Sequence, residues 1–316
     1  MHTPNPDSYT GTTVYMFPGQ GSQVPGMRQV VASWCPELLD VADRLVGEPL
    51  MVRPTDDTRL LQPAIYLASI AGWLCAADLR DSGNPPPSIP AIPAADVILG
   101  HSLGEVAALA VGGAFSALDG LHIVVRRGEL MAEAAAAQPG GGMMAALGAP
   151  AETVQNLAAD LSLIVATDNA PGQTVLAGRR DDLERAEHAL FADGHKAVLL
   201  PIEGAFHSPE MNCIKDEFIS AVHAATPHTP GVPVISSHTG REFTDVPSQL
   251  GDSLVGAVNF RQSLLALRQR GFTDFVDCGP GHVLARLVRR TLGTDATSIY
   301  DLHDGQLVMP PLQKGA

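Results

Sequence analysis

The pattern of apolar and polar positions in the first half of the chain predicts strands and helices in alternation. Two short apolar runs, at 13–17 and 95–99, each lead into a glycine-containing turn, as buried strands often do. Helical periodicity predicts helices over residues 27–32, 36–45, 59–79, 106–111 and 119–137. Five prolines between residues 81 and 93 exclude regular structure there and predict a surface connection.

The order of elements changes at residue 140. We predict strands over 143–147, 163–167, 174–177 and 196–201, and helices over 152–161 and 181–192. This βαββαβ order predicts a small ferredoxin-like subdomain at 140–202. Beyond it, strands near 232–236 and 275–277 and a helix over 283–292 return to α/β character. The sequence therefore predicts a large α/β-hydrolase-like domain with a parallel sheet, formed by residues 1–139 and 203–316, and a ligand groove beside the inserted subdomain.

Composition limits the possible functions. Of the 316 residues, 45% are hydrophobic and 17% are charged, which is typical of a compact globular protein. The formal net charge of −14 disfavours nucleic acid as a partner, because phosphate binding needs a basic surface. An acidic protein partner is also repelled unless it docks on a local basic patch. The longest mostly apolar run, 64–77, suits a buried helix and is too short to span a membrane.

The cysteines and the first residues favour a cytoplasmic protein. None of the four cysteines belongs to a CxxC pair, so neither a metal site nor a disulfide framework is expected. Residues 1–10 are polar and contain two prolines, unlike a secretory signal.

A candidate nucleophile lies between a predicted strand and a predicted helix. The segment GHSLG at 100–104 matches G-x-S-x-G in the strand-turn-helix context that this motif requires. Its glycines permit a tight turn that exposes Ser102, and the following helix directs backbone N–H groups toward a developing oxyanion. We therefore expect Ser102 to be the nucleophile of an acyl-transfer reaction.

A serine hydroxyl needs a base within hydrogen-bonding reach, and histidine is the usual one. Among the eleven histidines, His101 adjoins the serine, but neighbours in a tight turn point apart. His207 follows the last strand of the predicted subdomain, where the chain returns to the groove. His207 is therefore the better candidate for the base on the residues alone.

Six segments, in order over roughly residues 14–292, resemble the malonyl-CoA:acyl carrier protein transacylases and the acyltransferases of polyketide synthases, including free-standing, trans-acting ones. These segments are FPGQGSQ (17–23), GHSLGE (100–105), RRG (126–128), NAPGQ (169–173), GAFH (204–207) and GPGHVL (279–284).

The resemblance implies roles for particular residues. Ser102 is acylated and His207 is its base, while the backbone N–H groups of Gln20 and Leu103 form the oxyanion hole. Arg127 binds the free carboxylate of the donor, for which a planar guanidinium is well shaped.

Further substrate contacts follow from the same resemblance. Phe206 either narrows the space beside the donor's α-carbon, which favours malonyl over methylmalonyl, or simply packs in the core. Asn169 lies in the loop that lines the pocket. Ser253 stands where bacterial transacylases commonly have glutamine, and its backbone carbonyl is expected to orient the base. Asp277 and Asp168 remain candidates for the acid of a conventional triad.

The implied reaction moves a malonyl or related carboxyacyl group from coenzyme A, through an acyl-serine, to the phosphopantetheine thiol of an acyl carrier protein, in polyketide or fatty acid biosynthesis. Coenzyme A thioester is the donor, and no tightly bound cofactor, metal, nucleic acid or membrane is needed. An acidic carrier requires positive charge at the groove. Two basic groups could supply it or could be ordinary solvated faces: Arg286, Arg289 and Arg290 at helical spacing, or Arg179 and Arg180.

Three other functions compete with this one. An α/β-hydrolase esterase has its histidine near the C-terminus and no βαββαβ insertion. An editing acyl hydrolase that clears carrier proteins tends to lack the carboxylate-binding arginine, which is present here as Arg127. A non-catalytic docking subunit does not need the hydroxyl of Ser102 or the imidazole of His207.

Overall fold

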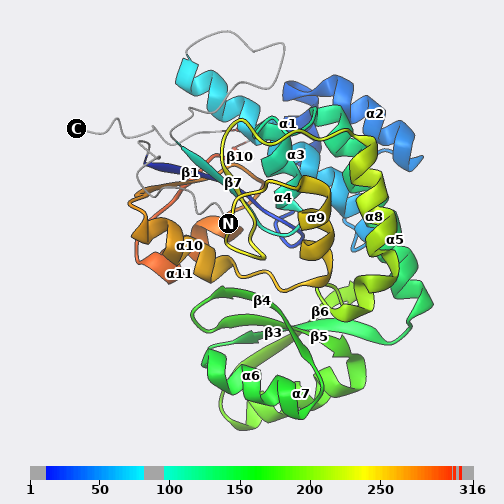
Figure 1. Ribbon diagram of the computed structural model, residues 1–316, viewed down its shortest axis with the longest axis vertical. Helices are drawn as coiled ribbons and strands as arrows, with labels where there is room; N and C mark the ends of the chain where they lie inside the picture. The colour runs from blue at the N-terminus through cyan, green and yellow to red at the C-terminus, as the bar shows by residue number, and fades with distance from the viewer. Residues whose placement is uncertain (1–11, 82–95, 301, 304–305, 308–316) are drawn as a thin grey trace.

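The computed structural model describes residues 12–81, 96–300, 302–303 and 306–307. The predicted surface connection at 81–93 and the polar segment at 1–10 lie almost wholly outside these residues. The described chain forms two main β-sheets with helices packed around them, as Figure 1 shows. A further two-stranded pairing joins β10 (Leu302–His303) to β11 (Gln306–Leu307).

The larger sheet has five parallel strands in the order β7-β2-β1-β8-β9. They are β1 (Thr13–Phe17), β2 (Val97–Gly100), β7 (Val234–Ile235), β8 (Asp274–Asp277) and β9 (Thr297–Ser298). At the carboxyl ends of β1 and β2, Phe17 pairs with Gly100. Because parallel strands end at the same edge, the segments that follow β1 and β2 lie side by side, where ligands of such sheets usually bind.

Nine helices surround this sheet in the described residues. They are α1 (Met27–Trp34), α2 (Pro36–Val46), α3 (Thr58–Asp81), α4 (Gly104–Val111), α5 (Ala117–Ala137), α8 (Asn212–Ala224), α9 (Val246–Val255), α10 (Phe260–Gln269) and α11 (Val283–Leu292). Helix α3 is long and apolar enough to cross a membrane, but 94% of its most apolar window is buried inside the protein. The prediction of a buried helix is therefore confirmed.

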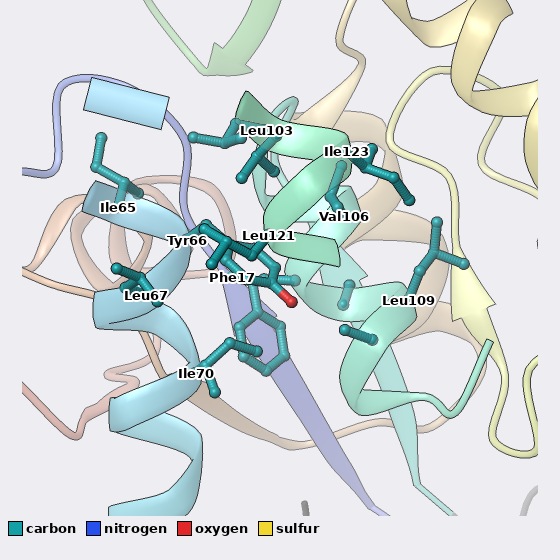
Figure 2. Packing of buried hydrophobic residues seen from close by; sticks show 14 of the residues in the cluster. Phe17, Ile65, Tyr66, Leu67, Ile70, Leu103, Val106, Leu109, Leu121 and Ile123 are labelled. Carbon is teal, nitrogen blue, oxygen red and sulfur yellow. The ribbon is translucent and has the colours of Figure 1, made fainter. Parts of the chain in front are cut away.

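Alternate residues of the central strands face different hydrophobic cores, because successive side chains of a strand point to opposite faces. Phe17 and Ile98 belong to the core that includes α3, α4 and α5. Met16 and Leu99 pack with residues of α10 and α11 on the other face. Figure 2 shows the first core, with the ring of Phe17 beside side chains of α3. Burial on both faces explains why these strands have unbroken apolar sequences.

The smaller sheet is antiparallel, with the strand order β4-β5-β3-β6. Its elements are β3 (Gly141–Leu147), α6 (Ala151–Asp160), β4 (Ile164–Ala170), β5 (Gln173–Arg179), α7 (Arg180–Ala192) and β6 (Lys196–Glu203). All six elements have the predicted type and differ from the predicted bounds by three residues at most. Figure 1 places α6 and α7 on the face turned away from the larger sheet. Met144 and Leu176 pack with these helices, whereas Met143 and Val175 join the main core.

The sequence pattern did not predict α8, α9 or α10, nor the short 3₁₀ helix Pro209–Met211. These helices lie between the smaller sheet and β8, and the end of α9 brings backbone carbonyl groups to the site described below. The region 203–282 is therefore more helical than expected.

Candidate active site

Ser102 lies in the turn between β2 and α4, and its backbone has a φ of 52°. Positive φ is costly for a residue with a side chain and persists only where surrounding structure enforces it. The two motif glycines make the turn possible. A Cβ added to Gly100 would lie 2.3 Å from the backbone nitrogen of Glu105, and one added to Gly104 would lie 1.9 Å from the carbonyl oxygen of Phe17. No larger residue fits either position without moving the backbone.

The structure brings Ser102 and His207 into direct contact. The Oγ of Ser102 lies 2.7 Å from Nε2 of His207. On the other side of the ring, Nδ1 lies 3.0 Å from the carbonyl oxygen of Ser253 and 3.2 Å from that of Gly256. Carbonyl oxygens only accept, so the ring proton belongs on Nδ1, and Nε2 presents its lone pair to the serine hydroxyl.

The imidazole of His207 is buried and neutral. Burial, together with the positive charge of Arg127 and the nearby His101, lowers its pKa to about 3. A neutral ring with a free lone pair can accept a proton at any pH above this value.

Two candidates for a conventional triad acid lie elsewhere, so that alternative is wrong. The carboxylate of Asp277 accepts N–H groups from Gly279 and Ala285 at the start of α11. Asp168 forms a bidentate ion pair with Arg261, with N–O distances of 2.7 to 3.0 Å. Backbone carbonyls orient His207 in place of a carboxylate.

Arg127 reaches Ser102 from α5. Its side chain is buried, and Nη1 donates to Oε1 of Gln62 at 2.7 Å, while Nη2 donates to Oγ of Ser102 at 3.3 Å. Burial lowers its pKa to about 10, opposed by the charge of Glu105, so the guanidinium stays charged at neutral pH. Arg127 therefore places a buried positive charge beside the serine oxygen.

The neighbouring Arg126 points away from the site. It pairs at the surface with Glu129, Glu133 and Glu217. The two adjacent arginines thus have different environments.

The segment after β1 lies against the serine turn. A Cβ on Gly19 would come within 2.8 Å of the carbonyl oxygen of His101, so only glycine allows this approach. Gln20 follows it, and Leu103 follows the serine. Within the described residues, neither of their backbone N–H groups donates a hydrogen bond. Both remain available for an oxyanion.

Two hollows meet at Gln20. The first, of about 840 Å³, is bordered by Gln20, His101 and Asn169 and by α11. We call it the arginine-lined groove, because it is also lined by Arg286, Arg289 and Arg290. Asn169 borders this groove, and its side-chain oxygen lies 2.7 Å from Nε2 of His101.

The second hollow, of about 1090 Å³, is lined in large part by apolar side chains, and among the charged ones acids outnumber the two arginines, Arg59 and Arg180. Its lining includes Phe206 and Arg180 and the carboxylates of Glu48, Asp56, Asp57, Glu129, Glu133 and Glu203. The side chain of Phe206 is 4% exposed, so it both packs in the core and borders this hollow. Of the two basic groups predicted from sequence, only the one on α11 lines the groove beside His101; Arg180 lies among acids, and Arg179 lines neither hollow.

Several site residues were not found from the sequence. Gln62 is fully buried and holds Arg127, and the only sign of it was a lone amide within the apolar face of a long helix. Glu105 is also buried and accepts hydrogen bonds from the backbone N–H and hydroxyl of Ser237 at 2.7 and 2.9 Å. The backbone carbonyl of Gly256 also contacts His207, but a glycine has no side chain whose chemistry would point to this role.

The site presents several groups suited to acyl chemistry: an oriented neutral imidazole, a serine oxygen, two available N–H groups and a buried guanidinium. Such a set suits transfer of an acyl group that carries a carboxylate. In the described part of the chain, no group of three or more His, Cys, Asp and Glu residues could hold a metal ion.

Comparison with known proteins agrees with this chemistry. The model of the acyl transferase domain family matches residues 14–308. The chain is 33% identical over 290 residues to the polyketide biosynthesis malonyl CoA-acyl carrier protein transacylase PksC of Bacillus subtilis, covering 87% of this chain and 96% of PksC. It is 35% identical over 291 residues to the polyketide biosynthesis protein ThaF of Burkholderia thailandensis, but covers only 24% of that protein and 88% of this chain.

A solved structure is also similar. It holds PlMCAT, a malonyl-transacylase, in complex with AntF, its type II polyketide synthase acyl-carrier protein. The TM-score is 0.80 at 26% identity, covering 92% of this chain and 97% of that chain. The match of the family model over nearly the whole chain is decisive: this protein belongs to the acyl transferase domain family.

Proposed function

We propose that this protein transfers a malonyl or related carboxyacyl group from coenzyme A to the phosphopantetheine thiol of an acyl carrier protein. The observation that carries the proposal is the position of the Ser102 oxygen, 2.7 Å from Nε2 of His207 and 3.3 Å from Nη2 of Arg127. The names of PksC and of the malonyl-transacylase bound to its carrier support the same donor and acceptor.

The residues perform the transfer in two half-reactions. His207 takes the hydroxyl proton as the oxygen of Ser102 attacks the thioester carbonyl, and the N–H groups of Gln20 and Leu103 stabilise the oxyanion. Collapse of this intermediate breaks the C–S bond, and the imidazolium returns the proton to the departing thiolate of coenzyme A. The carrier thiol then attacks the acyl-serine and gives its proton to His207, after which the ester bond breaks and Ser102 regains the proton.

Arg127 is the group that selects the donor. A buried guanidinium binds a carboxylate by two parallel hydrogen bonds, and little water competes for it. Arg127 also disfavours the alternative of an editing acyl hydrolase. An unsubstituted acyl chain has no carboxylate to pair with a buried positive charge beside the nucleophile. Phe206, on the neighbouring wall, would restrict substituents on the donor's α-carbon.

The carrier is proposed to dock on α11. Arg286, Arg289 and Arg290 line the groove that leads to His101, and an acidic carrier is attracted by such a patch in an otherwise acidic protein. A pantetheine arm can follow this groove to Ser102.

Finer features of the architecture are also proposals. The order β4-β5-β3-β6 with two helices on one face supports a ferredoxin-like subdomain at 140–202. Residues 1–139 and 203–316 would form the α/β-hydrolase-like domain around the parallel sheet. Relatives named for polyketide biosynthesis favour that pathway over fatty acid synthesis. None of the four cysteines forms a disulfide in the described residues, which favours the cytoplasm.

The proposal is tested by intact-mass spectrometry with a panel of acyl-coenzyme A donors, followed by addition of a phosphopantetheinylated carrier. We expect the mass of a malonyl ester on the wild type, its absence from S102A, and its transfer to the carrier. Rapid loss of the ester to water without a carrier would favour the hydrolase. No labelling by any donor would favour a non-catalytic docking subunit.

A further inference from the structure

We infer that Thr58 and Gln62 of α3 are positioning residues that join Arg127 to the side chain of Gln20 in one chain of hydrogen bonds. This inference rests on the proposed function, because it assigns Arg127 to the donor's carboxylate and the Gln20 N–H to the oxyanion. Neither Thr58 nor Gln62 needs to touch the substrate.

The chain has three hydrogen bonds. Nη1 of Arg127 donates to Oε1 of Gln62 at 2.7 Å, and Nε2 of Gln62 donates to Oγ1 of Thr58 at 3.0 Å. The hydroxyl of Thr58 then donates to Oε1 of Gln20, also at 3.0 Å. Every donor points the same way, from the guanidinium to the loop after β1. Hydrogen bonds in such a series polarise and strengthen one another, most of all with a charge at their head.

The surroundings hold the middle of the chain in place. Gln62 has no exposed surface, and a buried amide that lost a partner would pay its full desolvation cost. Helix α3 lies very close to α5 here, since a Cβ on Gly128 would come within 3.0 Å of the carbonyl oxygen of Thr58.

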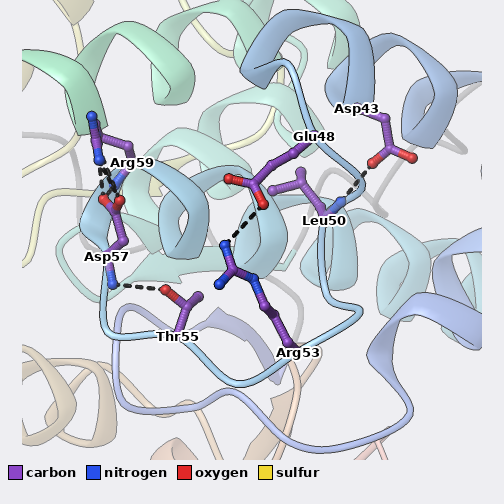
Figure 3. Close-up of polar contacts among 7 residues, drawn as sticks. All are labelled: Asp43, Glu48, Leu50, Arg53, Thr55, Asp57 and Arg59. Carbon is purple, nitrogen blue, oxygen red and sulfur yellow. Dashed lines mark hydrogen bonds and ion pairs between the residues drawn. The ribbon is translucent and has the colours of Figure 1, made fainter.

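The segment before Thr58 is also fixed, as Figure 3 shows. The backbone N–H of Asp57 donates to Oγ1 of Thr55 at 3.0 Å, and the Asp57 carboxylate accepts the backbone N–H of Arg59 at 2.9 Å. These contacts set the first turn of α3, so the hydroxyl of Thr58 has a defined direction.

The chain matters because a carboxylated donor is held at both ends. Arg127 binds the donor's carboxylate at one end. The thioester carbonyl at the other end reaches the N–H of Gln20 only if the loop after β1 lies at the right distance from the guanidinium. A 1 Å misplacement of reacting groups can cost about 100-fold in rate. An acetyl donor has no such tether and can settle against the loop wherever it lies. Breaking the chain should therefore slow malonyl transfer more than acetyl transfer.

The experiment compares T58V, which removes only the hydroxyl, with T58S, which keeps it. Single-turnover acylation of Ser102 is measured by intact mass with malonyl-coenzyme A and with acetyl-coenzyme A. T58V removes both hydrogen bonds of the Thr58 hydroxyl, and we expect the malonyl rate to fall about tenfold, which corresponds to about 1.4 kcal/mol. The acetyl rate should change less than about twofold, and T58S should keep the wild-type ratio of the two rates. A second variant, Q20M, removes the far end of the chain but keeps the backbone N–H, and should lower the ratio of the malonyl rate to the acetyl rate in the same direction.

Two results would overturn the inference while leaving the proposed function intact. One is an unchanged malonyl-to-acetyl ratio in both T58V and Q20M, and the other is an equal fall for both donors, which marks a general structural defect. Thermal unfolding of each variant identifies such a defect directly. If the wild type itself takes no acyl group from any donor, the proposed function fails and this inference with it.

Discussion

At the scale of single residues, the nucleophile and its proposed base share an uncommon backbone conformation. Ser102 has a φ of 52° and His207 a φ of 57°. Left-handed φ values at residues with side chains cost of order 1 to 3 kcal/mol each, so the surrounding fold must enforce them. In both cases the strain directs a side chain out of a turn and toward the other residue, which gives the 2.7 Å contact.

The first prediction concerns the two adjacent arginines. R127A should lower the malonyl acylation rate roughly 100-fold, because it removes charge-assisted hydrogen bonds worth about 3 kcal/mol. Acetyl acylation should fall much less. R126A is the matched control, since Arg126 pairs only with surface carboxylates, and it should leave both rates near the wild-type values. Single-turnover mass spectrometry measures all four rates; undiminished malonyl transfer in R127A would remove its assigned role.

The second prediction concerns pH. A histidine base works in its neutral form, and burial lowers the pKa of His207 to about 3. The rate of malonyl acylation should therefore stay level as the pH falls from 8 to 5. A base with the ordinary pKa of about 6.5 would lose about 30-fold over the same range. Stopped-flow measurement of the acylation rate against pH decides between the two, and an acid limb near pH 6.5 would contradict a buried neutral imidazole.

The sequence predicted this site unevenly. Ser102 was identifiable because its glycines and the strand and helix around it form a local pattern. His207 and Arg127 needed the family resemblance, since nothing near them in sequence reveals which fold partners they meet. The hydrogen-bond partners of His207 were hardest to predict. One of them is the backbone carbonyl of Gly256, and every residue type has such a carbonyl.

At the scale of elements, Glu105 connects α4 to the segment between β7 and α9. Its buried carboxylate accepts both the backbone N–H and the hydroxyl of Ser237. The same segment leads into α9, whose Ser253 carbonyl orients His207. Glu105 thus links the helix that follows Ser102 to the segment that leads into α9.

The third prediction tests this connection. E105A should lower the free energy of unfolding by about 2 to 4 kcal/mol, because it leaves the Ser237 N–H unpaired in the interior and opens a cavity. E105Q keeps an acceptor oxygen and nearly the same volume, so its loss should be about 1 kcal/mol or less. Urea denaturation measures both. Equal losses in the two variants would show that the negative charge, and not the hydrogen bond to Ser237, is what matters.

Helices α8, α9 and α10 show why some elements could not be predicted. Helix α9 contains Pro247 and Gly251, two residues that weaken a helix prediction. The structure explains the glycine: a Cβ there would lie 2.5 Å from the side chain of Ile219 on α8. Close packing between the two helices requires this glycine, and that requirement is visible only in the folded chain. The βαββαβ segment was predictable because each of its elements has its own local pattern.

At the scale of the whole molecule, charge is unevenly distributed around the site. The protein has a formal net charge of −14, and acids outnumber arginines among the charged side chains of the larger hollow beside Phe206. The groove beside His101 is instead lined by the three arginines of α11. On the proposed function, this distribution would repel an acidic carrier from most of the surface and attract it to one opening.

The last prediction tests this docking surface with R289E/R290E. Arg289 is 77% exposed and only loosely paired with Asp295 at 3.6 Å, so its charge is open to a partner. We expect the KM for the carrier to rise about tenfold, as for two lost rim charge pairs, while acyl-serine formation at saturating donor changes less than about twofold. The difference from wild type should shrink at high salt, since exposed charges are screened.

The matched control is R185E/K196E, which makes the same change of net charge on α7 and β6, at two residues that line neither hollow. If only the overall charge governs the carrier, both double variants should raise the KM equally. A rise of the KM for the carrier in R289E/R290E alone means that the carrier binds the local patch on α11. Equal loss of acyl-serine formation and of carrier-dependent turnover in R289E/R290E would instead mean that α11 supports the site itself, because a docking surface affects only the half-reaction in which the carrier takes part.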